Sequence, residues 1–477
     1  MTTPSRPTLS AWVLVAVASL AGAVSLCAGS ISDVDLFWHV EVGTYTLHGD
    51  GFPFPDPWAY TLPDVHWHST AWLSELVLAA VYDAAGWAGI VVLRLLLTVG
   101  LYGLLGRLVL GVRSAREGWA GPVVLAVTAI PLAGFVQERP QTVSLLFCVW
   151  LAARVRDLLL DAKAPRPVTF VAMTWLWAWL HGLFVLAPAM LVLCALAQLL
   201  DHGRTALPLA RRLALTATTA VAASAATAMG PRLLLAPFTV SSAARGFIAE
   251  WQPTPISYHP AWGLYALLGL VLLAWARTTR PVPRSEALVV LVLAVFGLVA
   301  IRNCAPASLI LIPIVLNRVV LTWRTESTLR LPRRLVVGIG ALAMVSAVAS
   351  YAKYPPLDGT EPSRLAAVLA AQPEPVRVLD DYNLSGFLIS RAHGHIKLVV
   401  DGRADRYGKA FLDRYEATVV RAEDWQKEIA KLRPDVAVLG KKSALGQLLV
   451  SEAGWRLVLV DESFALLAAP GTTLVMP

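Results

Sequence analysis

A stretch of chain near the N-terminus gathers acidic and imidazole side chains without a single Lys or Arg. It runs from residue 29 to residue 73 and holds six carboxylates and four histidines. Asp33 and Asp35 form an Asp-x-Asp pair, and His39 follows one helical turn later. Paired carboxylates can accept a proton from an attacking hydroxyl group or bind a hard divalent cation such as Mg²⁺ or Mn²⁺. Asp33 and Asp35 are therefore candidate catalytic residues and a possible metal site.

The same residues also fit a structural role. Ser32 can be the N-cap of a helix that runs to about Leu47, with Asp35 three residues further on, where a negative charge is favourable. Zinc is a poor fit to the histidines, because His66 and His68 show neither the HExxH pattern nor a Cys/His ligand spacing.

The composition is typical of an integral membrane protein. Of 477 residues, 57% are hydrophobic and 15% are charged, and the mean hydropathy is +0.62. Apolar runs near the ~20 residues needed to cross a bilayer recur along the chain, which predicts a polytopic α-helical membrane protein. The predicted spans are 9–30, 88–111, 119–135, 141–160, 167–182, 183–201, 210–229, 261–277, 285–301, 303–322 and 334–352. The four cysteines fall in apolar segments, which favours small buried side chains over disulfides or metal ligands.

The arginines predict the orientation of these spans. Every second connection is rich in Lys and Arg, whereas the opposite connections carry only Arg139, Arg232, Arg245 and Arg302. By the positive-inside rule, the basic loops face the cytoplasm. We therefore expect a bacterial cytoplasmic membrane protein with its N-terminus inside and its C-terminal part outside. The net charge of +8 is explained by topology, and we expect no nucleic-acid partner.

One segment could reverse this orientation. Residues 70–86 are apolar enough to be counted as a span, which would turn every later loop to the opposite side. The segment is short and interrupted by Ser74, Glu75 and Asp83, so we interpret it as an interfacial helix on the outer face.

The chain divides into two domains by composition. Residues 1–354 form the predicted transmembrane domain, with 31–87 as its first outer loop. Residues 355–477 are patterned as a soluble α/β domain, with strands at 376–380, 396–400, 435–440 and 455–461 and helices at 422–433 and 443–452. Its motif "DGRADRYG" could contact a ligand or form a structural ion-pair turn.

Polar side chains collect at the predicted outer ends of the spans. Ionisable groups near a membrane core cost a few kcal/mol unless they are paired or hydrated, so they are functional candidates. We predict that they meet the acidic pair in one outward cavity. The residues are Glu138, Arg139, His181, Arg232, Glu250 and Arg302. Alternatively, Glu138 and Arg139 neutralise each other, His181 is a packed, hydrogen-bonded histidine, and tryptophans such as Trp67 belong to an interfacial belt.

An acidic pair in the first outer loop, ten or more spans and an outward C-terminal domain resemble the GT-C superfamily of membrane glycosyltransferases. The chain is most similar to a bacterial branch whose first outer loop reads Asp-x-Asp-x-x-Trp-His. The matching pieces are "DVDLFWHVEVG", "FPFPDPWAYT", "WLSE", "ERPQTVS", "WLWAWLHG", "AEWQP", "DDYNLSGFLI" and "VVDGRADRYG". The chain departs from the branch where His-Glu would precede Trp-Leu, because it has Thr70 and Ala71 there.

This resemblance implies transfer of a sugar from a polyprenyl-phosphate donor to an extracytoplasmic acceptor, with inversion. Asp33, or else Asp35, would accept the proton of the acceptor hydroxyl group. The leaving phosphate would be stabilised by Arg139, Arg232 and Arg302 or by a divalent metal ion. Glu138, His181, Glu250 and His39 would hold these groups or the sugar hydroxyls. The alternatives are a non-catalytic scaffold with the GT-C fold and a transporter or flippase of lipid-linked sugars.

Overall fold

The computed structural model describes residues 8–161, 163–323, 329–359, 361–392 and 394–477. The chain forms two units. The helical unit comprises Met1–Ser30, Val91–Leu234 and Ala249–Pro355, and the sheet unit comprises Ile31–Ile90, Leu235–Ile248 and Pro356–Pro477.

Each of the predicted spans corresponds to one α-helix, with bounds that differ by a few residues. These helices are α1 (Trp12–Leu26), the later part of α3 (Trp72–Leu110), α5 (Ala120–Leu132), α6 (Pro140–Leu159), α7 (Pro167–Leu180), α8 (Leu186–His202), α9 (Leu207–Ser224), α11 (Trp262–Arg277), α12 (Arg284–Val299), α13 (Cys304–Thr322) and α14 (Arg333–Ala349). Among the described residues, five helical runs are long and apolar enough to cross a membrane. The polytopic helical class is therefore confirmed, whereas the number of spans stays a prediction.

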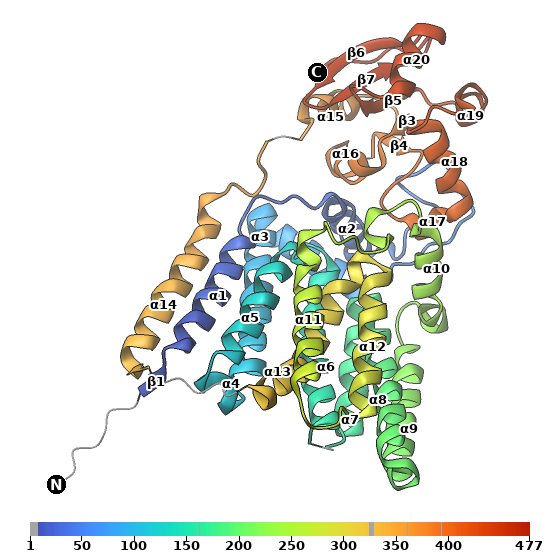
Figure 1. The fold of residues 1–477 in the computed structure, drawn as a ribbon. Coiled ribbons are helices and arrows are strands. Elements are labelled where there is room, and N and C mark those ends of the chain that lie inside the picture. Colours follow the sequence, from blue (N-terminus) through green and yellow to red (C-terminus); the bar gives the residue numbers. More distant parts are fainter. Residues whose placement is uncertain (1–7, 162, 324–328, 360, 393) are drawn as a thin grey trace, which may run out of the picture. The chain divides into compact units, whose positions relative to one another are not determined.

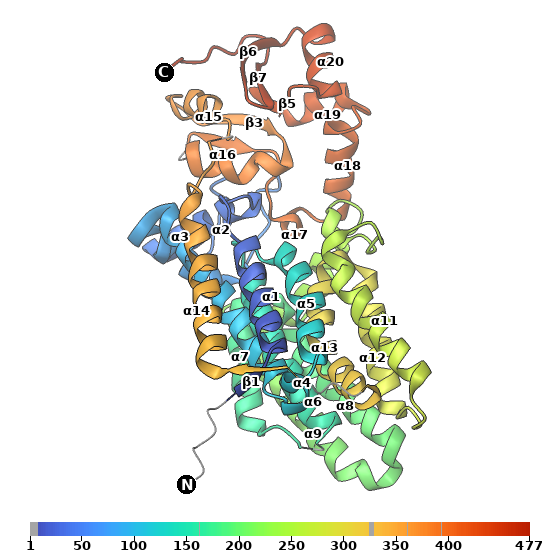
Figure 2. The ribbon, with the colours of Figure 1, turned by 60° about the vertical axis from the view of Figure 1, so that its left-hand side comes forward.

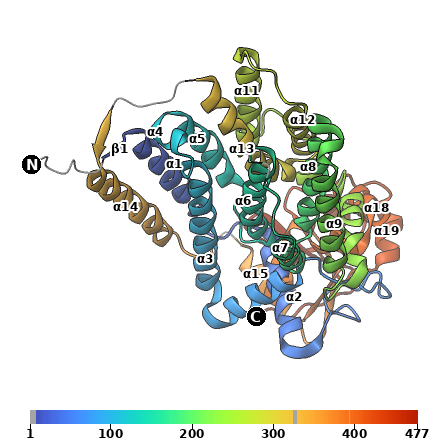
Figure 3. The same cartoon turned by 90° about the horizontal axis from the view of Figure 1, so that it is seen from below.

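Helix α13 lies at the centre of the helical unit and packs against α5, α6, α11 and α12. Its most apolar stretch is 83% buried, compared with 17% for α14. Helices α1 and α14 run side by side (Figures 1 and 3). Strand β1 (Thr8–Ser10) pairs antiparallel with β2 (Arg330–Pro332), so the starts of α1 and α14 lie at one end of the unit, as the predicted topology requires.

Helix α3 is interrupted at Gly86, which has φ +59°. A backbone with positive φ favours glycine because a Cβ atom would be strained there. The part before Gly86 is therefore a helix distinct from the part that follows. The interfacial position expected for residues 70–86 stays a prediction.

The sheet unit contains a five-stranded sheet in the order β4-β3-β5-β7-β6 (Figure 1), and Figure 2 shows β3, β5, β7 and β6 from another side. Strand β3 is parallel to both β4 and β5, whereas β7 is antiparallel to β5 and β6. The strands are β3 (Val376–Asp380), β4 (Ile396–Leu398), β5 (Val436–Gly440), β6 (Arg456–Asp461) and β7 (Phe464–Ala468), and the helices are α15 (Ser363–Ala370), α16 (Ser385–Ala392), α17 (Ala404–Tyr407), α18 (Lys409–Val419), α19 (Trp425–Leu432) and α20 (Ala444–Glu452). The predicted strands and the two predicted helices are confirmed. Strand β7, "FALLA", was not predicted because its alanine-rich run lacks β-branched residues and alternation.

The predicted first outer loop packs within the sheet unit. It begins with α2 (Val34–Tyr45) and the π-helical turn η1 (Thr46–Asp50). Further along, Ala59 forms a parallel bridge with Leu398, and the Leu398 N–H group donates to the carbonyl of Trp58 at 2.7 Å. Trp58 and Trp67 are buried in one core with residues of α15, α16 and β3. The interfacial-belt interpretation of Trp67 was therefore wrong, since its ring lies in a protein core.

The domain boundary predicted at residue 355 stays a prediction. The structure adds that residues 31–90 and a second segment, 235–248, pack with the C-terminal part of the chain. The second segment carries α10 (Ala236–Ala244), and Phe247 beyond it meets the ring of Tyr382 edge-on at 4.8 Å.

Candidate functional site

Asp33 is the N-cap of α2. Its Oδ1 atom accepts a hydrogen bond from the N–H group of Asp35 at 3.0 Å, and the side chain is only 2% exposed. The expected helix start is thus real, but the N-cap is Asp33 and not Ser32, because Asp33 has the extended backbone that a cap requires. Asp35 lies in the first turn and accepts a hydrogen bond from Nε1 of Trp38 at 3.1 Å.

Two glycines of the C-terminal segment lie directly against α2. A Cβ atom at Gly402 would lie 2.2 Å from Nε1 of Trp38 and 3.0 Å from Oδ1 of Asp35, and one at Gly386 would lie 2.8 Å from the carbonyl oxygen of Val34. A larger residue would therefore require the Trp38 side chain to move at Gly402 and the backbone to move at Gly386. The glycines of "DDYNLSG" and "DGRADRYG" therefore allow close packing that fixes the first turn of α2.

His39 pairs with a glutamate of α3. Its Nδ1 atom lies 2.9 Å from Oε1 of Glu75, whose side chain is 1% exposed. The imidazole also packs on Trp38, with ring centroids 3.6 Å apart. Gly43 permits this approach, because a Cβ atom there would lie 2.1 Å from the Glu75 carbonyl oxygen. The chain thus has Thr70 and Ala71 where the sequence resemblance led us to expect His-Glu, and it holds a buried His–Glu pair, His39 and Glu75, between α2 and α3.

The motif "DGRADRYG" forms a buried ion-pair network. Arg403 bonds both oxygens of Asp401, at 2.9 and 2.6 Å, and lies 2.8 Å from Asp56 of the predicted outer loop. Arg406 reaches the same Asp56 oxygen at 2.8 Å. Burial alone would raise the pKa of Asp401, but the charge and hydrogen bonds of Arg403 lower it below its usual range. This is the ion-pair turn that the sequence left as one of two alternatives.

The Arg403 guanidinium lies between two aromatic rings, 4.9 Å from the centroid of Trp58 and 5.0 Å from that of Trp67. Cation–π contacts of this kind stabilise a desolvated guanidinium. The motif therefore joins residues 56–67 to the C-terminal segment.

Asp380, at the carboxyl end of β3, anchors the strand-end loop before this motif. Its Oδ1 atom accepts hydrogen bonds from the N–H groups of Val399 and Val400, at 3.1 and 3.3 Å. The side chain is completely buried. Burial raises the pKa of Asp380 well above its usual range.

We expect Asp380→Asn to remove a pH-dependent loss of stability. Because the folded state raises the pKa of this carboxyl above the unfolded value of about 3.9, its contribution to stability is full below about pH 3.9 and is lost as the pH rises through the folded pKa. Asparagine keeps the oxygen that accepts from Val399 and Val400 but cannot ionise. The thermal unfolding midpoint of the variant should therefore rise relative to that of the wild-type protein as the pH is raised from about 4 to about 7. A constant difference in midpoint over that range would contradict the assignment.

In the helical unit, two arginines are held by adjacent residues of the short helix η6 (Ala249–Trp251). Nη1 of Arg139 lies 2.6 Å from Oε1 of Glu250, and the guanidinium of Arg302 lies 4.3 Å from the ring centroid of Trp251. Arg302 also donates to Oε1 of Gln141 in a long hydrogen bond of 3.5 Å. The structure thus brings together Arg139, Glu250 and Arg302, which lie far apart in the sequence.

These contacts surround the first turn of α6. Arg139 is the N-cap residue of this helix, and Gln141 lies in its first turn. One turn further along, Oγ of Ser144 lies 2.9 Å from Nδ1 of His181 and accepts a hydrogen bond from Nε1 of Trp177 at 2.7 Å. His181 also caps η3 (Gly182–Val185) by accepting from the N–H group of Leu183 at 3.3 Å, so it matches the alternative of a packed, hydrogen-bonded histidine.

Glu138 forms a buried ion pair with Arg94 of α3. Arg94 also donates to the carbonyl oxygen of Gly29, and its guanidinium lies 5.4 Å from the ring centroid of Tyr351. Sequence reasoning missed Arg94, although an arginine well inside an apolar span is a signal for a buried partner. Arg232 is exposed in η5 (Gly230–Leu234), and among the described residues no hydrogen bond or ion pair joins its side chain to the α6 group.

A second buried ion pair of the helical unit joins α12 to α13. Nε of Arg318 lies 2.5 and 2.6 Å from the two oxygens of Glu286, and Nε1 of Trp275 donates to the same carboxylate at 2.7 Å. The charges of Arg318 and Glu286 neutralise each other, and the carboxylate also accepts the hydrogen bond from Trp275.

The predicted site residues are divided between the two units. Asp33, Asp35 and His39 belong to the sheet unit, whereas Glu138, Arg139, His181, Arg232, Glu250 and Arg302 belong to the helical unit. A single cavity shared by both sets stays a prediction. Across the described ranges, no group of three or more His, Cys, Asp or Glu side chains could hold a metal ion.

No protein-family model matches the sequence, and no curated protein matches it. Solved structures do. ArnT from Cupriavidus metallidurans in the apo state is 14% identical and superposes with a TM-score of 0.52 over 95% of this chain and 97% of its own. The apo oligosaccharyltransferase of Archaeoglobus fulgidus is 11% identical, with a TM-score of 0.53 over 90% of this chain and 69% of its own. The same enzyme in complex with Zn and sulfate gives a TM-score of 0.52 over 90% and 68%.

The chain has the GT-C fold. Both neighbours are GT-C proteins, and the superposition on ArnT extends over nearly all of both chains. The resemblance drawn from the sequence is thereby confirmed at the level of the fold. The GT-C fold and the apolar helices together make this a multi-pass membrane protein.

Proposed function

We propose that this protein is a glycosyltransferase that moves a sugar from a polyprenyl-phosphate donor to an extracytoplasmic acceptor. The observation that supports it best is the pair of arginines at the first turn of α6, in a chain with the GT-C fold. A guanidinium binds phosphate oxygens with charge-assisted hydrogen bonds. The amino-terminal end of a long helix also favours an anion.

The two arginines would stabilise the leaving group. Glu250 holds Arg139, and Gln141 and Trp251 orient Arg302, so both cations are positioned before the donor binds. Fixed cations of this kind stabilise charge that develops in the transition state. Arg232 makes no such contact in the described structure, and the proposal does not require it.

Asp33 would accept the proton in this scheme. The acceptor hydroxyl oxygen attacks the anomeric carbon and forms the new glycosidic bond while the bond from carbon to the phosphate oxygen breaks. The phosphate leaves with the electron pair, the hydroxyl proton passes to the Asp33 carboxylate, and the anomeric centre is inverted. Asp35, held by Trp38 and backed by Gly402, would keep the first turn of α2 in place.

A divalent cation is compatible with this pair of acids. Mg²⁺ uses one or two protein carboxylates together with substrate phosphates and water, and Asp33 and Asp35 are the carboxylates that would hold it. When bound, it would add positive charge for the leaving phosphate. Addition of EDTA, followed by Mg²⁺ or Mn²⁺, decides whether transfer depends on it.

Deleting the gene should cause the lipid-linked donor to accumulate and one surface glycan to lose a sugar. Wild-type protein should restore both pools, whereas Arg302→Ala and Arg139→Ala should each lower transfer by about 10²–10³-fold, the usual cost of a lost transition-state donor. Mass spectrometry of lipid-linked sugars and of surface glycans measures this.

Arg245→Ala is the matched control, because Arg245 is another predicted outward arginine but is exposed, and among the described residues its side chain bonds only to Ser241, at 3.5 Å. It should restore both pools fully. If deletion changes neither pool, the transferase proposal fails and a non-catalytic scaffold is favoured. If the sugar-loaded lipid accumulates only on the cytoplasmic side, a flippase is favoured.

A further inference from the structure

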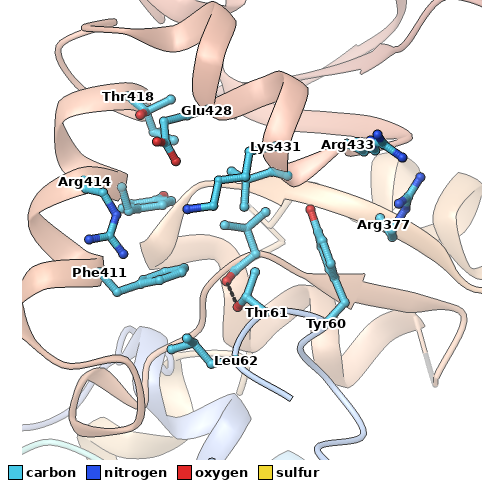
Figure 4. A pocket seen from close by; sticks show the side chains of 14 residues that line it. Tyr60, Thr61, Leu62, Arg377, Phe411, Arg414, Thr418, Glu428, Lys431 and Arg433 are labelled. Atoms are coloured by element: carbon cyan, nitrogen blue, oxygen red, sulfur yellow. Dashed lines mark hydrogen bonds between the residues drawn. The ribbon is translucent and has the colours of Figure 1, made fainter. Parts of the chain in front are cut away.

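A cavity of about 370 Å³ in the sheet unit has four basic side chains among the residues that line it (Figure 4). It lies among α18, α19, the start of β3 and residues 60–62 of the predicted outer loop. Its volume falls in the range of small-molecule sites and suits one or two sugar rings. The contacts described above for α2 and α6 do not involve it.

Four basic side chains and one carboxylate line this cavity. The bases are Arg377, Arg414, Lys431 and Arg433, and the acid is Glu428. Arg377 is already held by Asp435, with its Nη2 atom 2.9 Å from Oδ1. Arg414, Lys431 and Arg433 are exposed and have no ion-pair partner among the described residues. The cavity therefore keeps an excess of positive charge, which attracts an anion.

The walls also offer aromatic faces and a hydrogen-bond donor. Figure 4 shows the ring of Phe411 below Arg414, and Tyr60 on the opposite side toward Arg377. The hydroxyl oxygen of Tyr60 is buried and has no hydrogen-bond partner within the described ranges. Burial, reinforced by the nearby Asp380 carboxylate, raises the pKa of Tyr60, so the hydroxyl remains a donor at neutral pH. A buried donor without a partner costs free energy that a bound ligand can recover.

We propose that this cavity binds an anionic saccharide of one or two rings that carries a phosphate or carboxylate group. Arg414, Lys431 and Arg433 would hold the anionic group, Tyr60 would donate to a sugar oxygen, and Phe411 would pack against a ring face. This inference rests on the proposed function, and it identifies the acceptor of the sugar as an acidic glycan.

The test uses the full-length protein in lipid nanodiscs and isothermal titration calorimetry. The probes are glucose 1-phosphate, glucuronate, glucose and inorganic phosphate. We expect at least one of the two anionic sugars to bind at least ~10-fold more tightly than glucose and than inorganic phosphate. The variant Arg414→Ala/Lys431→Ala should weaken that binding by at least ~10-fold, since each charged hydrogen bond contributes that much or more.

Lys442→Ala/Arg456→Ala removes the same charge from exposed positions of the same unit outside the cavity and should bind as wild type. Equal binding of glucose, equal binding of inorganic phosphate, or equal loss in both variants would overturn the proposal. Tyr60→Phe, which keeps the ring, should weaken the sugar but not inorganic phosphate. Sugar transfer is assayed separately. If the anionic sugar binds but no transfer is seen, only the proposed function is contradicted. If transfer is seen without binding, only the assignment of the cavity is contradicted.

Discussion

Asp33→Asn should lower the rate of sugar transfer by about 10²–10⁴-fold, the usual contribution of a positioned general base. The substitution is well suited to the question because asparagine caps a helix as well as aspartate does. Its side-chain oxygen can still accept from the N–H group of Asp35, as Oδ1 of Asp33 does now. The variant therefore loses the charge and keeps the start of α2.

Two companion variants separate chemistry from folding. Asp33→Ala should lose transfer and also about 1 kcal/mol of stability, because the cap is removed. Asp35→Asn should have the smaller effect on the rate, since Asp35 is held by Trp38. Transfer measured in membranes with the natural donor, beside thermal unfolding of each protein, gives both quantities. Full transfer by Asp33→Asn would contradict the base assignment, and loss confined to Asp35→Asn would move it to Asp35.

Arg403→Met should destabilise the sheet unit by about 3–5 kcal/mol, the usual cost of breaking a buried ion pair from one side. Methionine fills part of the space between Trp58 and Trp67, but it leaves Asp401 buried without its cation, whereas Asp56 keeps its ion pair with Arg406. Thermal unfolding and limited proteolysis of the purified protein should both show the loss.

Arg421→Met is the control for this prediction. Arg421 pairs with Glu416 at 2.9 Å and is 45% exposed, and exposed pairs contribute about 0–1 kcal/mol. Adding Asp401→Asn to Arg403→Met should recover part of the stability, because the stranded Asp401 charge disappears, whereas Asp56 is still paired with Arg406. Equal unfolding midpoints for Arg403→Met and wild type would show that the network does not hold the unit together.

The helices and most strands could be predicted because their signals are local. Apolar runs of about 20 residues predict α13 and its neighbours, and β-branched runs predict β3 and β5. The N-cap of α2 was misplaced by one residue because Ser32 and Asp33 are both good caps, and only the backbone conformation distinguishes them. Local patterning therefore gave the elements but not their exact starts.

The pairings could not be predicted because they join distant residues. Asp56 and Arg403 are neighbours only once the segment at Ala59 has bridged to Leu398. Likewise, Glu138 has an arginine beside it in the sequence, yet it forms a buried ion pair with the distant Arg94 inside an apolar helix. Hydropathy separates apolar from polar segments, but it does not say which polar groups meet.

The division of the sheet unit along the chain has a consequence for biogenesis. Residues 31–90 are synthesised before the whole of 91–355, and their partner segment 356–477 comes last. Translation proceeds at ~5–20 residues per second, so Phe37, Trp38 and Trp58 stay uncovered for roughly 15–50 s until the strands that bury them are synthesised. The early segment therefore exposes apolar side chains during that interval, and we expect a ribosome that stalls before residue 356 to leave a nascent chain prone to aggregation and proteolysis.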